Sequence, residues 1–258
     1  MKRNEDLRIL VRSYVDDLPD GAAFSHRSAL IVHGLSIPYS EKGPPTRVEF
    51  AHPEVGAQRS FVHVWKRPLE GSIEVVDRCR VTTLPRTLRD VARDCPLAFA
   101  VAVVDEAIRR NLTSAREFAD YCARNLVRTR QRRIDAVLAN VDGRRESVAE
   151  SITAVRFVEY SVPGFEPQVV ICDENGDFVA RTDFANRKAR VIAEFDGAGK
   201  YYLDGADPKR AFEHERRREY SLRNLGYQVF RITWKDLFSG DLFLRIKESV
   251  KRRSAQTV

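Results

Sequence analysis

The sequence has little of what marks secreted, zinc-binding or membrane-spanning proteins. Its 258 residues include four cysteines, none in a C-x-x-C pair and none at metal-ligand spacing from a histidine. The longest apolar run, residues 97–104, is far shorter than the roughly 20 residues of a membrane helix. The opening residues MKRNEDLRIL place acids where a signal peptide has its apolar segment. We therefore expect a cytoplasmic protein with reduced cysteines and no membrane partner.

Charge is abundant instead. Lysine and arginine number 44 against 37 aspartate and glutamate residues, which gives a formal net charge of +7 and a pI of about 9.4. A basic excess permits binding to a polyanion, but a soluble surface with spare arginine explains it too. The hydrophobic share of 43% is typical of a globular protein.

Hydrophobic spacing divides the chain into two regions. Residues 1–142 predict a mixed α/β and helical region, and Asp142-Gly143 breaks the last helical run. Residues 143–258 predict the order α-β-β-β-α-β-α. The expected elements of the first region are helices over 5–17, 25–34 and several segments of 85–140, and strands over 47–50, 61–65 and 73–79. Those of the second are helices over 147–160, 208–225 and 242–252, and strands over 168–172, 178–184, 190–195 and 227–232.

Acidic side chains gather at the end of one predicted strand. Side chains alternate along a strand, so Glu194 and Asp196 point to one face, and Asp183 lies near the end of the preceding strand. If those two strands pair, Asp183 and Glu194 approach within reach of one divalent ion, and Mg²⁺ takes one or two carboxylates with water and phosphate oxygens. The ordinary alternative is that these acids pair with basic residues nearby in sequence: Arg181, Arg187, Lys188 and Arg190.

Several short stretches carry a family resemblance. They are SVAES at 147–151, PQV at 167–169, TDF at 182–184, EFDG at 194–197, KY at 200–201, ERRREYSL at 215–222 and GYQVFRITW at 226–234. In this order, residues 147–238 resemble the very-short-patch-repair-like branch of the PD-(D/E)xK nuclease superfamily. The resemblance implies a restriction-endonuclease-like α/β fold and a Mg²⁺ or Mn²⁺ cofactor.

The same resemblance implies roles for single residues. Asp183 and Glu194 would hold the metal, with Glu150 as an accessory acid from the leading helix. Asp196 stands where many members of the superfamily have the lysine of E-x-K, and Lys200 would supply the cation instead. Gln168 would contact either the metal-bound water or the interior of the fold.

The first region carries a second resemblance. FSHRSAL at 24–30 and HGL at 33–35 are similar to the central region of AbiE-type antitoxins of type IV toxin–antitoxin systems. Those proteins usually begin with a winged-helix segment of some fifty residues, and this sequence starts after that point, so either the module is missing or the start differs. A promoter-binding role is weakened accordingly. A cognate toxin or phage-defence protein is the implied partner. Ser25 beside His26 also raises nucleophilic chemistry, which we set aside because Ser25 suits a helix N-cap.

Arginine clusters predict contacts with nucleic-acid phosphates. One arginine-rich run, residues 124–133, has no acid before Asp135, and a second group of arginines follows the acidic strand. The alternative for both groups is a solvated or salt-bridged helix face. The candidates are Arg128, Arg130, Arg132, Arg133, Arg217, Arg218 and Arg231. The leading hypothesis is a Mg²⁺-dependent DNA endonuclease. The alternatives are a non-catalytic antitoxin or transcriptional regulator that uses the nuclease fold for binding, and a nuclease that acts on RNA.

Overall fold

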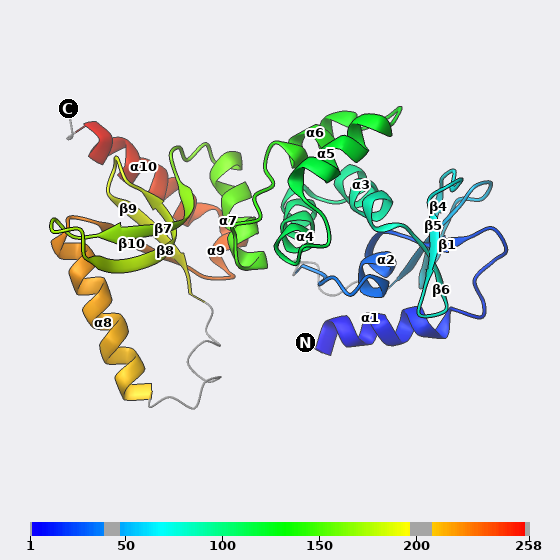
Figure 1. Cartoon of the computed structure of the whole chain (residues 1–258), viewed down its shortest axis with the longest axis horizontal. Coiled ribbons are helices and arrows are strands. Elements are labelled where there is room, and N and C mark those ends of the chain that lie inside the picture. The colour runs from blue at the N-terminus through cyan, green and yellow to red at the C-terminus, as the bar shows by residue number, and fades with distance from the viewer. Residues whose placement is uncertain (1, 39–46, 197–207, 256–258) are drawn as a thin grey trace. The chain divides into compact units, whose positions relative to one another are not determined.

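The structure is a computed structural model that describes residues 2–38, 47–196 and 208–255 (Figure 1). The chain forms two compact units, Met1–Val148 and Ala149–Val258, called unit 1 and unit 2 below. The sequence places its boundary after residue 142. Both units are mixed α/β structures, and each contains its own sheet. Within the described residues, no helix is both long enough and apolar enough to cross a membrane.

Unit 1 contains a six-stranded mixed sheet in the order β3-β4-β2-β1-β6-β5. Its strands are β1 (Ala23–Phe24), β2 (Val48–His52), β3 (Ala57–Gln58), β4 (Val62–Lys66), β5 (Ile73–Val76) and β6 (Cys79–Thr82). Its helices are α1 (Lys2–Ser13), α2 (His26–Val32), α3 (Leu84–Asp94), α4 (Leu97–Arg109), α5 (Ala115–Arg124) and α6 (Gln131–Leu138). Apolar side chains of α1 and α2 pack on the sheet, and α3 packs against α4, α5 and α6.

Strands β5 and β6 occupy the region in which the sequence predicts a single strand. The chain turns at Asp77 and Arg78, which both adopt left-handed conformations with φ of 48° and 66°. Two consecutive positive φ values form the tight turn that suits a β-hairpin, and glycine or asparagine usually supplies them. Asp77 and Arg78 are neither glycine nor asparagine, so the turn carries no sequence signal. The prediction of a single strand over 73–79 was wrong because this turn divides it.

Unit 2 has a four-stranded sheet in the order β10-β9-β8-β7. Strands β7, β8 and β9 form an antiparallel meander, and β10 returns parallel to β9. The element order agrees with the one predicted, apart from the additional short helix α9. The elements are α7 (Val148–Glu159), β7 (Glu166–Cys172), β8 (Phe178–Asn186), β9 (Val191–Phe195), α8 (Pro208–Asn224), β10 (Gln228–Ile232), α9 (Asp236–Ser239) and α10 (Asp241–Ala255).

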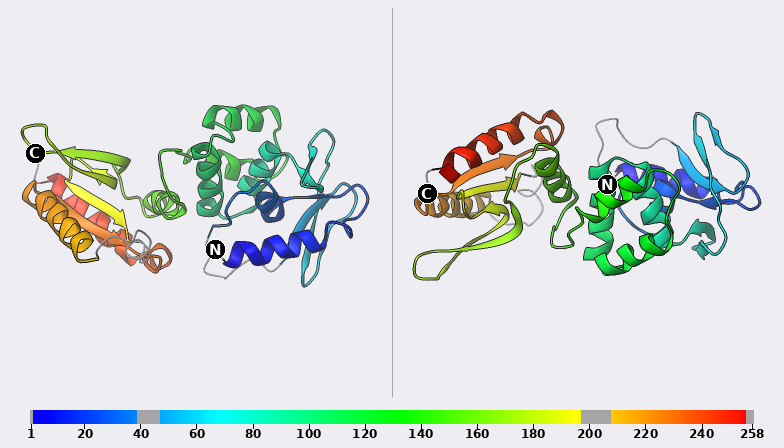
Figure 2. Two further views of the ribbon diagram at one scale, coloured as in Figure 1. Left: turned by 60° about the horizontal axis from the view of Figure 1, so that its bottom comes forward. Right: turned by 90° about the horizontal axis from the view of Figure 1, so that it is seen from above.

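Helices cover both faces of this sheet. Helix α8 lies on one face and α10 on the other (Figure 2). Leu222 of α8 packs with Ile192 of β9, so the α8 face also carries the alternating position Glu194. On the opposite face, the Phe157 ring of α7 lies 5.4 Å from Phe184 and 5.7 Å from Phe243 of α10. Buried apolar side chains on both faces hold β8 and β9 in the middle of the unit.

Two glycines of unit 2 allow a stability test. Gly240 (φ 78°) and Gly176 (φ 88°) both adopt left-handed backbone, but a methyl group added at Gly240 would overlap Tyr160, whereas at Gly176 it would meet nothing within 4 Å. We expect Gly176→Ala to lower the free energy of unfolding by about 1 kcal/mol through backbone strain alone. We expect Gly240→Ala to cost about 1–3 kcal/mol more, because Tyr160 must move. Urea unfolding of both variants measures the difference, and equal losses would contradict the packing at Tyr160.

Candidate functional site

Three charged side chains lie at one level across β8, β9 and β10. Phe184 pairs with Ala193, so the next step of the same antiparallel ladder sets Asp183 beside Glu194. On the other side of β9, Glu194 pairs directly with Arg231. Residues that face each other in a ladder point to the same side of the sheet. The register therefore brings together the two acids that the sequence predicts as a pair, and it adds Arg231 from a distant strand.

Gln168 occupies the matching position on β7. Its neighbours Pro167 and Val169 pair with β8 on either side of Asp183, so Gln168 lies across from Asp183. Gln168 itself has a φ of 56°, which is unusual for a residue other than glycine. Its amide Nε2 donates a hydrogen bond of 2.7 Å to Oε2 of Glu150, which is buried on α7. The predicted accessory acid and the predicted glutamine thus contact each other.

The carboxylate of Asp183 is partly used by the backbone. Its Oδ2 accepts a hydrogen bond of 2.8 Å from the amide of Phe195, the residue after Glu194. This bond fixes the carboxylate at the end of β9. The other carboxylate oxygen, Oδ1, is the atom that a metal ion or a further hydrogen-bond donor would contact.

Glu194 is buried and faces two arginines. It is 4% exposed, forms an ion pair with Arg218 of α8, and its Oε2 lies 2.7 Å from Nη1 of Arg231. No donor among the described residues is aligned for a hydrogen bond with that oxygen, so the Arg231 contact is a charge contact. Burial raises the pKa of Glu194, the two arginines lower it, and Asp183 raises it again. The net shift is upward, and a cation that replaced an arginine here would favour the ionised form.

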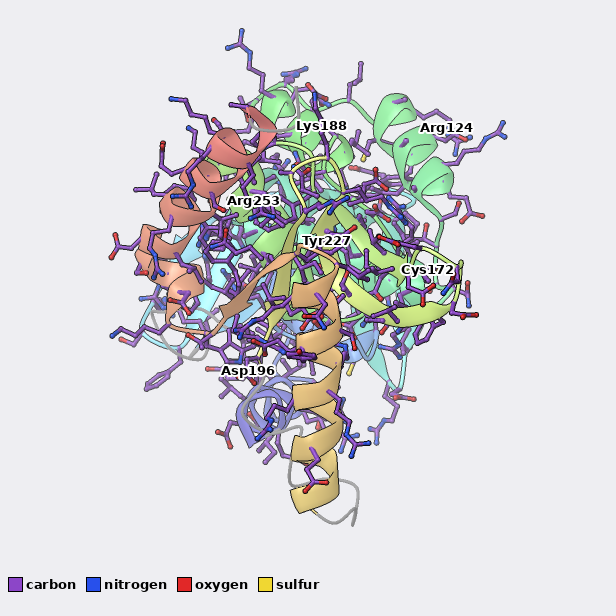
Figure 3. The ribbon with its side chains drawn as sticks, turned by 90° about the vertical axis from the view of Figure 1, so that its left-hand side faces the viewer. Arg124, Cys172, Lys188, Asp196, Tyr227 and Arg253 are labelled. Atoms are coloured by element: carbon purple, nitrogen blue, oxygen red, sulfur yellow. The ribbon has the colours of Figure 1, made fainter. Side chains whose placement is uncertain are left out.

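Asp196 follows the end of β9 and is exposed. Its backbone amide continues the ladder by donating to the carbonyl of Ile232 at 2.8 Å. Figure 3 shows Asp196 at the opposite end of β9 from Lys188, one of the residues considered as a local ion partner. Lys200 lies outside the described residues. The partners of Glu194 come from α8 and β10 rather than from the neighbouring sequence.

The carboxylate pair suits part of a metal site. Asp183 and Glu194 supply hard oxygen ligands on adjacent strands, and Mg²⁺ needs only one or two carboxylates when water and phosphate complete its shell. In the described part of the chain, however, no three His, Cys, Asp or Glu side chains are grouped to hold a metal. The residues therefore fit an ion that is bound by two carboxylates and shared with a phosphate, with Arg218 and Arg231 as its competitors for Glu194.

The predicted arginine run has partners that the sequence did not reveal. Arg130 forms an ion pair of 2.9 Å with Asp94, and Arg133 donates to the carbonyl of Cys95. Asp94 is the last residue of α3 and Cys95 follows it, so both partners lie more than thirty residues earlier in the chain. Arg128 and Arg132 are exposed. Although the run itself contains no acid, Arg130 and Arg133 are therefore paired with residues that are distant in the chain. In the second group, Arg217 is exposed on α8, whereas Arg218 and Arg231 contact Glu194.

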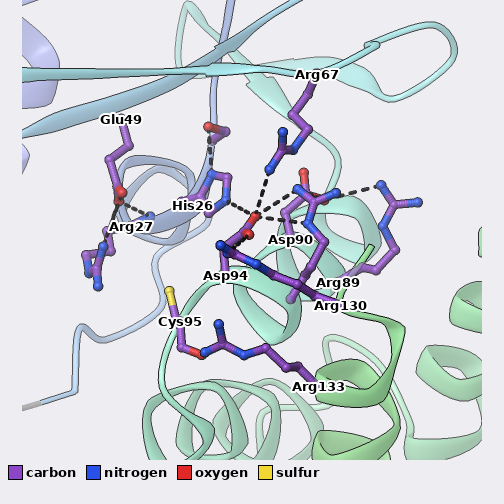
Figure 4. A network of polar contacts seen from close by, with 12 residues as sticks. His26, Arg27, Glu49, Arg67, Arg89, Asp90, Asp94, Cys95, Arg130 and Arg133 are labelled. Carbon is purple, nitrogen blue, oxygen red and sulfur yellow. Dashed lines mark hydrogen bonds and ion pairs between the residues drawn. The ribbon is translucent and has the colours of Figure 1, made fainter. Parts of the chain in front are cut away.

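Ser25 does not act as predicted. It stands at the N-cap of α2, but its side chain makes no capping hydrogen bond; its Oγ lies 3.0 Å from Nδ1 of His26. The other ring nitrogen of His26 lies 3.2 Å from Asp94 Oδ2. Ser25 and His26 are completely buried and the Asp94 side chain is 1% exposed, so no substrate reaches Ser25 without opening unit 1. Its position points to a structural role, which is to hold Asp94 (Figure 4).

No family model matches the chain, and neither the curated proteins nor the solved structures that were compared with it include a match.

Asp94 gives unit 1 a testable acid sensitivity. Burial alone would raise the pKa of Asp94, but His26 and Arg93 outweigh it through hydrogen bonds and charge, and the pKa is held well below its usual range. An unfolded aspartate titrates near pH 4, so this stabilisation is present above about pH 4 and is lost as the pH falls further.

We expect the free energy of unfolding of Asp94→Asn to fall less steeply than that of wild type between about pH 5 and pH 3. Urea unfolding at each pH measures both slopes. Asp120→Asn is the matched control because the Asp120 side chain is 58% exposed and lies as far as 3.9 Å from its ion partner Arg116. Equal slopes for wild type and Asp94→Asn would contradict the assigned role of Asp94.

Proposed function

We propose that the protein is a Mg²⁺- or Mn²⁺-dependent endonuclease that hydrolyses phosphodiester bonds of DNA, and that unit 2 has a restriction-endonuclease-like fold. The observation that carries this proposal is the register that sets Asp183 beside Glu194, with Arg231 paired to Glu194. A mixed sheet with an antiparallel meander, one parallel strand and helices on both faces supports the proposed fold. A toxin–antitoxin or phage-defence setting belongs to the same proposal and follows from the sequence resemblance alone.

Each residue of this site has its own role in hydrolysis. Asp183 and Glu194 would hold the ion, which supplies an activated water and offsets charge on the phosphate. Arg218 and Arg231 bind the scissile phosphate once they leave Glu194, and their planar guanidiniums suit its oxygens. Glu150 fixes the amide of Gln168 by accepting a 2.7 Å hydrogen bond from Nε2, so that the amide oxygen Oε1 can orient the attacking water. Asp196 lies exposed at the strand end, where it can accept the proton of that water.

One observation favours the alternative function. Glu194 already has two arginine partners, and Asp183 already accepts from a backbone amide. Acids that already have such partners are also expected in a nuclease fold that no longer catalyses hydrolysis. The alternative is a non-catalytic antitoxin or transcriptional regulator that uses the nuclease fold to bind nucleic acid or a protein partner.

A cleavage assay separates these functions. Supercoiled DNA, linear DNA, single-stranded DNA and RNA are each incubated with Mg²⁺, Mn²⁺ or EDTA. We expect metal-dependent cleavage of DNA by wild type and a loss of at least about a hundredfold in Asp183→Asn and Glu194→Gln, because each change removes a metal ligand worth several kcal/mol in the transition state.

Asp177→Asn is the matched control, since Asp177 is an exposed acid in the β7–β8 turn. It should cleave like wild type, and circular dichroism should show that all three variants are folded. Cleavage of RNA alone would reassign the substrate. No cleavage of any substrate, with nucleic-acid binding that both substitutions leave unchanged, would contradict the nuclease and favour the binding function.

A further inference from the structure

Unit 1 contains a second charged cluster that the proposed nuclease chemistry does not use. It is centred on two buried acids near the end of α3, Asp90 and Asp94, both at most 1% exposed at the side chain. Figure 4 shows the acids with basic side chains converging on them from several elements. Their guanidinium partners are Arg67, Arg86, Arg89, Arg93 and Arg130. Five guanidiniums and two carboxylates give these seven side chains a formal charge of +3.

This positive surplus is unfavourable in a partly buried group of charges. Burial, followed by the charge of Arg93, lowers the pKa of Arg67, although Asp90 and Asp94 partly oppose the shift. Three buried N–H groups also have no hydrogen-bond partner among the described residues, namely Nε of Arg67, Nε of Arg89 and Nε1 of Trp65. Buried donors are normally paired. The surplus of positive charge indicates that an anion belongs beside this cluster.

The start of α6 adds to the same surplus. Arg130 occupies its N-cap with a φ of 63° and provides no side-chain cap. The first turn has no acid and includes Arg132 and Arg133, although the N-terminal end of a helix carries partial positive charge and favours anions. A left-handed arginine at this point costs backbone energy, and the conformation lets its guanidinium reach Asp94 at 2.9 Å. The strained backbone of Arg130 thus places a further positive charge beside a cluster that already has too many.

Two arginines of the cluster face solvent. The side chain of Arg130 is 53% exposed and that of Arg67 is 27% exposed, whereas Arg86, Arg89 and Arg93 are buried. Arg67 and Arg130 contact the same carboxylate, Asp94, and are therefore neighbours. The buried arginines are held by Asp90 and Asp94, and they leave the two outer guanidiniums as the accessible edge of the cluster.

We propose that Arg67 and Arg130, together with the N-terminus of α6, form a binding site for a phosphoryl group. A phosphate brings the negative charge that the cluster lacks, and its oxygens accept from two guanidiniums at once. Asp94 fixes the spacing of the two arginines and is itself fixed by His26 and Ser25. The ligand is free phosphate, a strand-terminal phosphate or a backbone phosphate of nucleic acid. The site is independent of the acids in unit 2, so it stands whether or not the nuclease proposal does.

Trp65 provides a direct reporter for this site. The guanidinium of Arg67 lies 5.5 Å from the centre of the Trp65 ring, and the chain has only one other tryptophan, Trp234 in unit 2. In the full-length Trp234→Phe protein, fluorescence therefore reports on Trp65 alone. The titrants are inorganic phosphate, a 5′-phosphorylated oligonucleotide and the same oligonucleotide without its 5′-phosphate, all at constant ionic strength.

We expect a saturable change in fluorescence with phosphate, and a dissociation constant about tenfold higher in Arg130→Gln and in Arg67→Gln. Arg116→Gln is the matched control, because Arg116 is an arginine of unit 1 whose side chain is 92% exposed. It should bind like the parent protein. Tighter binding of the 5′-phosphorylated strand than of its unphosphorylated twin would assign the site to a strand end, and equal binding of the two would assign it to backbone phosphates.

The proposal is overturned if none of the three titrants gives saturation, or if Arg130→Gln binds as Arg116→Gln does. Circular dichroism checks that each variant is folded. If Arg130→Gln does not fold, Arg130→Lys replaces it, since lysine keeps the charge but loses the planar double contact. Weaker phosphate binding in folded Arg130→Lys supports the site, and unchanged binding contradicts it.

Discussion

The pairing register of β8, β9 and β10 is the constraint on which the candidate site depends. It places Asp183, Glu194 and Arg231 at one level and on one face. A shift of β9 by one residue would turn Glu194 toward the opposite, aromatic face and bring Ala193 into its place. Buried neighbours on both faces, among them Ile192 and Phe184, oppose such a shift. The apolar packing of unit 2 is thus what positions its charged residues.

The two units differ in the ratio of arginine to carboxylate side chains in their buried charge clusters. In unit 2, the acids Asp183 and Glu194 face the two arginines of Glu194, so charge is nearly balanced and a cation must compete for its place. In unit 1, five guanidiniums surround two carboxylates, so positive charge is in excess. Buried charge is costly unless it is paired, so the surplus in unit 1 favours an added anion, whereas in unit 2 a cation gains Glu194 only by displacing an arginine.

Strand alternation and the spacing of acids were sufficient to predict that Asp183 and Glu194 meet, because both lie on strands that are consecutive in the chain. The partners of Glu194 were beyond such reasoning, since they arrive from α8 and from a strand that returns in parallel. Asp94 was missed for the same reason: its contacts with His26 and Arg130 link residues far apart in sequence. The left-handed residues Asp77 and Gln168 carry no glycine signal that would have revealed them.

Binding of Mn²⁺ in the absence of nucleic acid is the decisive measurement for the site in unit 2, because it depends on the two carboxylates and on no catalytic step. Electron paramagnetic resonance measures free Mn²⁺ during titration of wild type, Asp183→Asn, Glu194→Gln and the control Asp177→Asn. We expect about one bound ion per chain in wild type and in the control, and none in the other two variants. Equal binding by wild type and Asp183→Asn, or no binding by any of the four proteins, would rule out a metal site at Asp183 and Glu194.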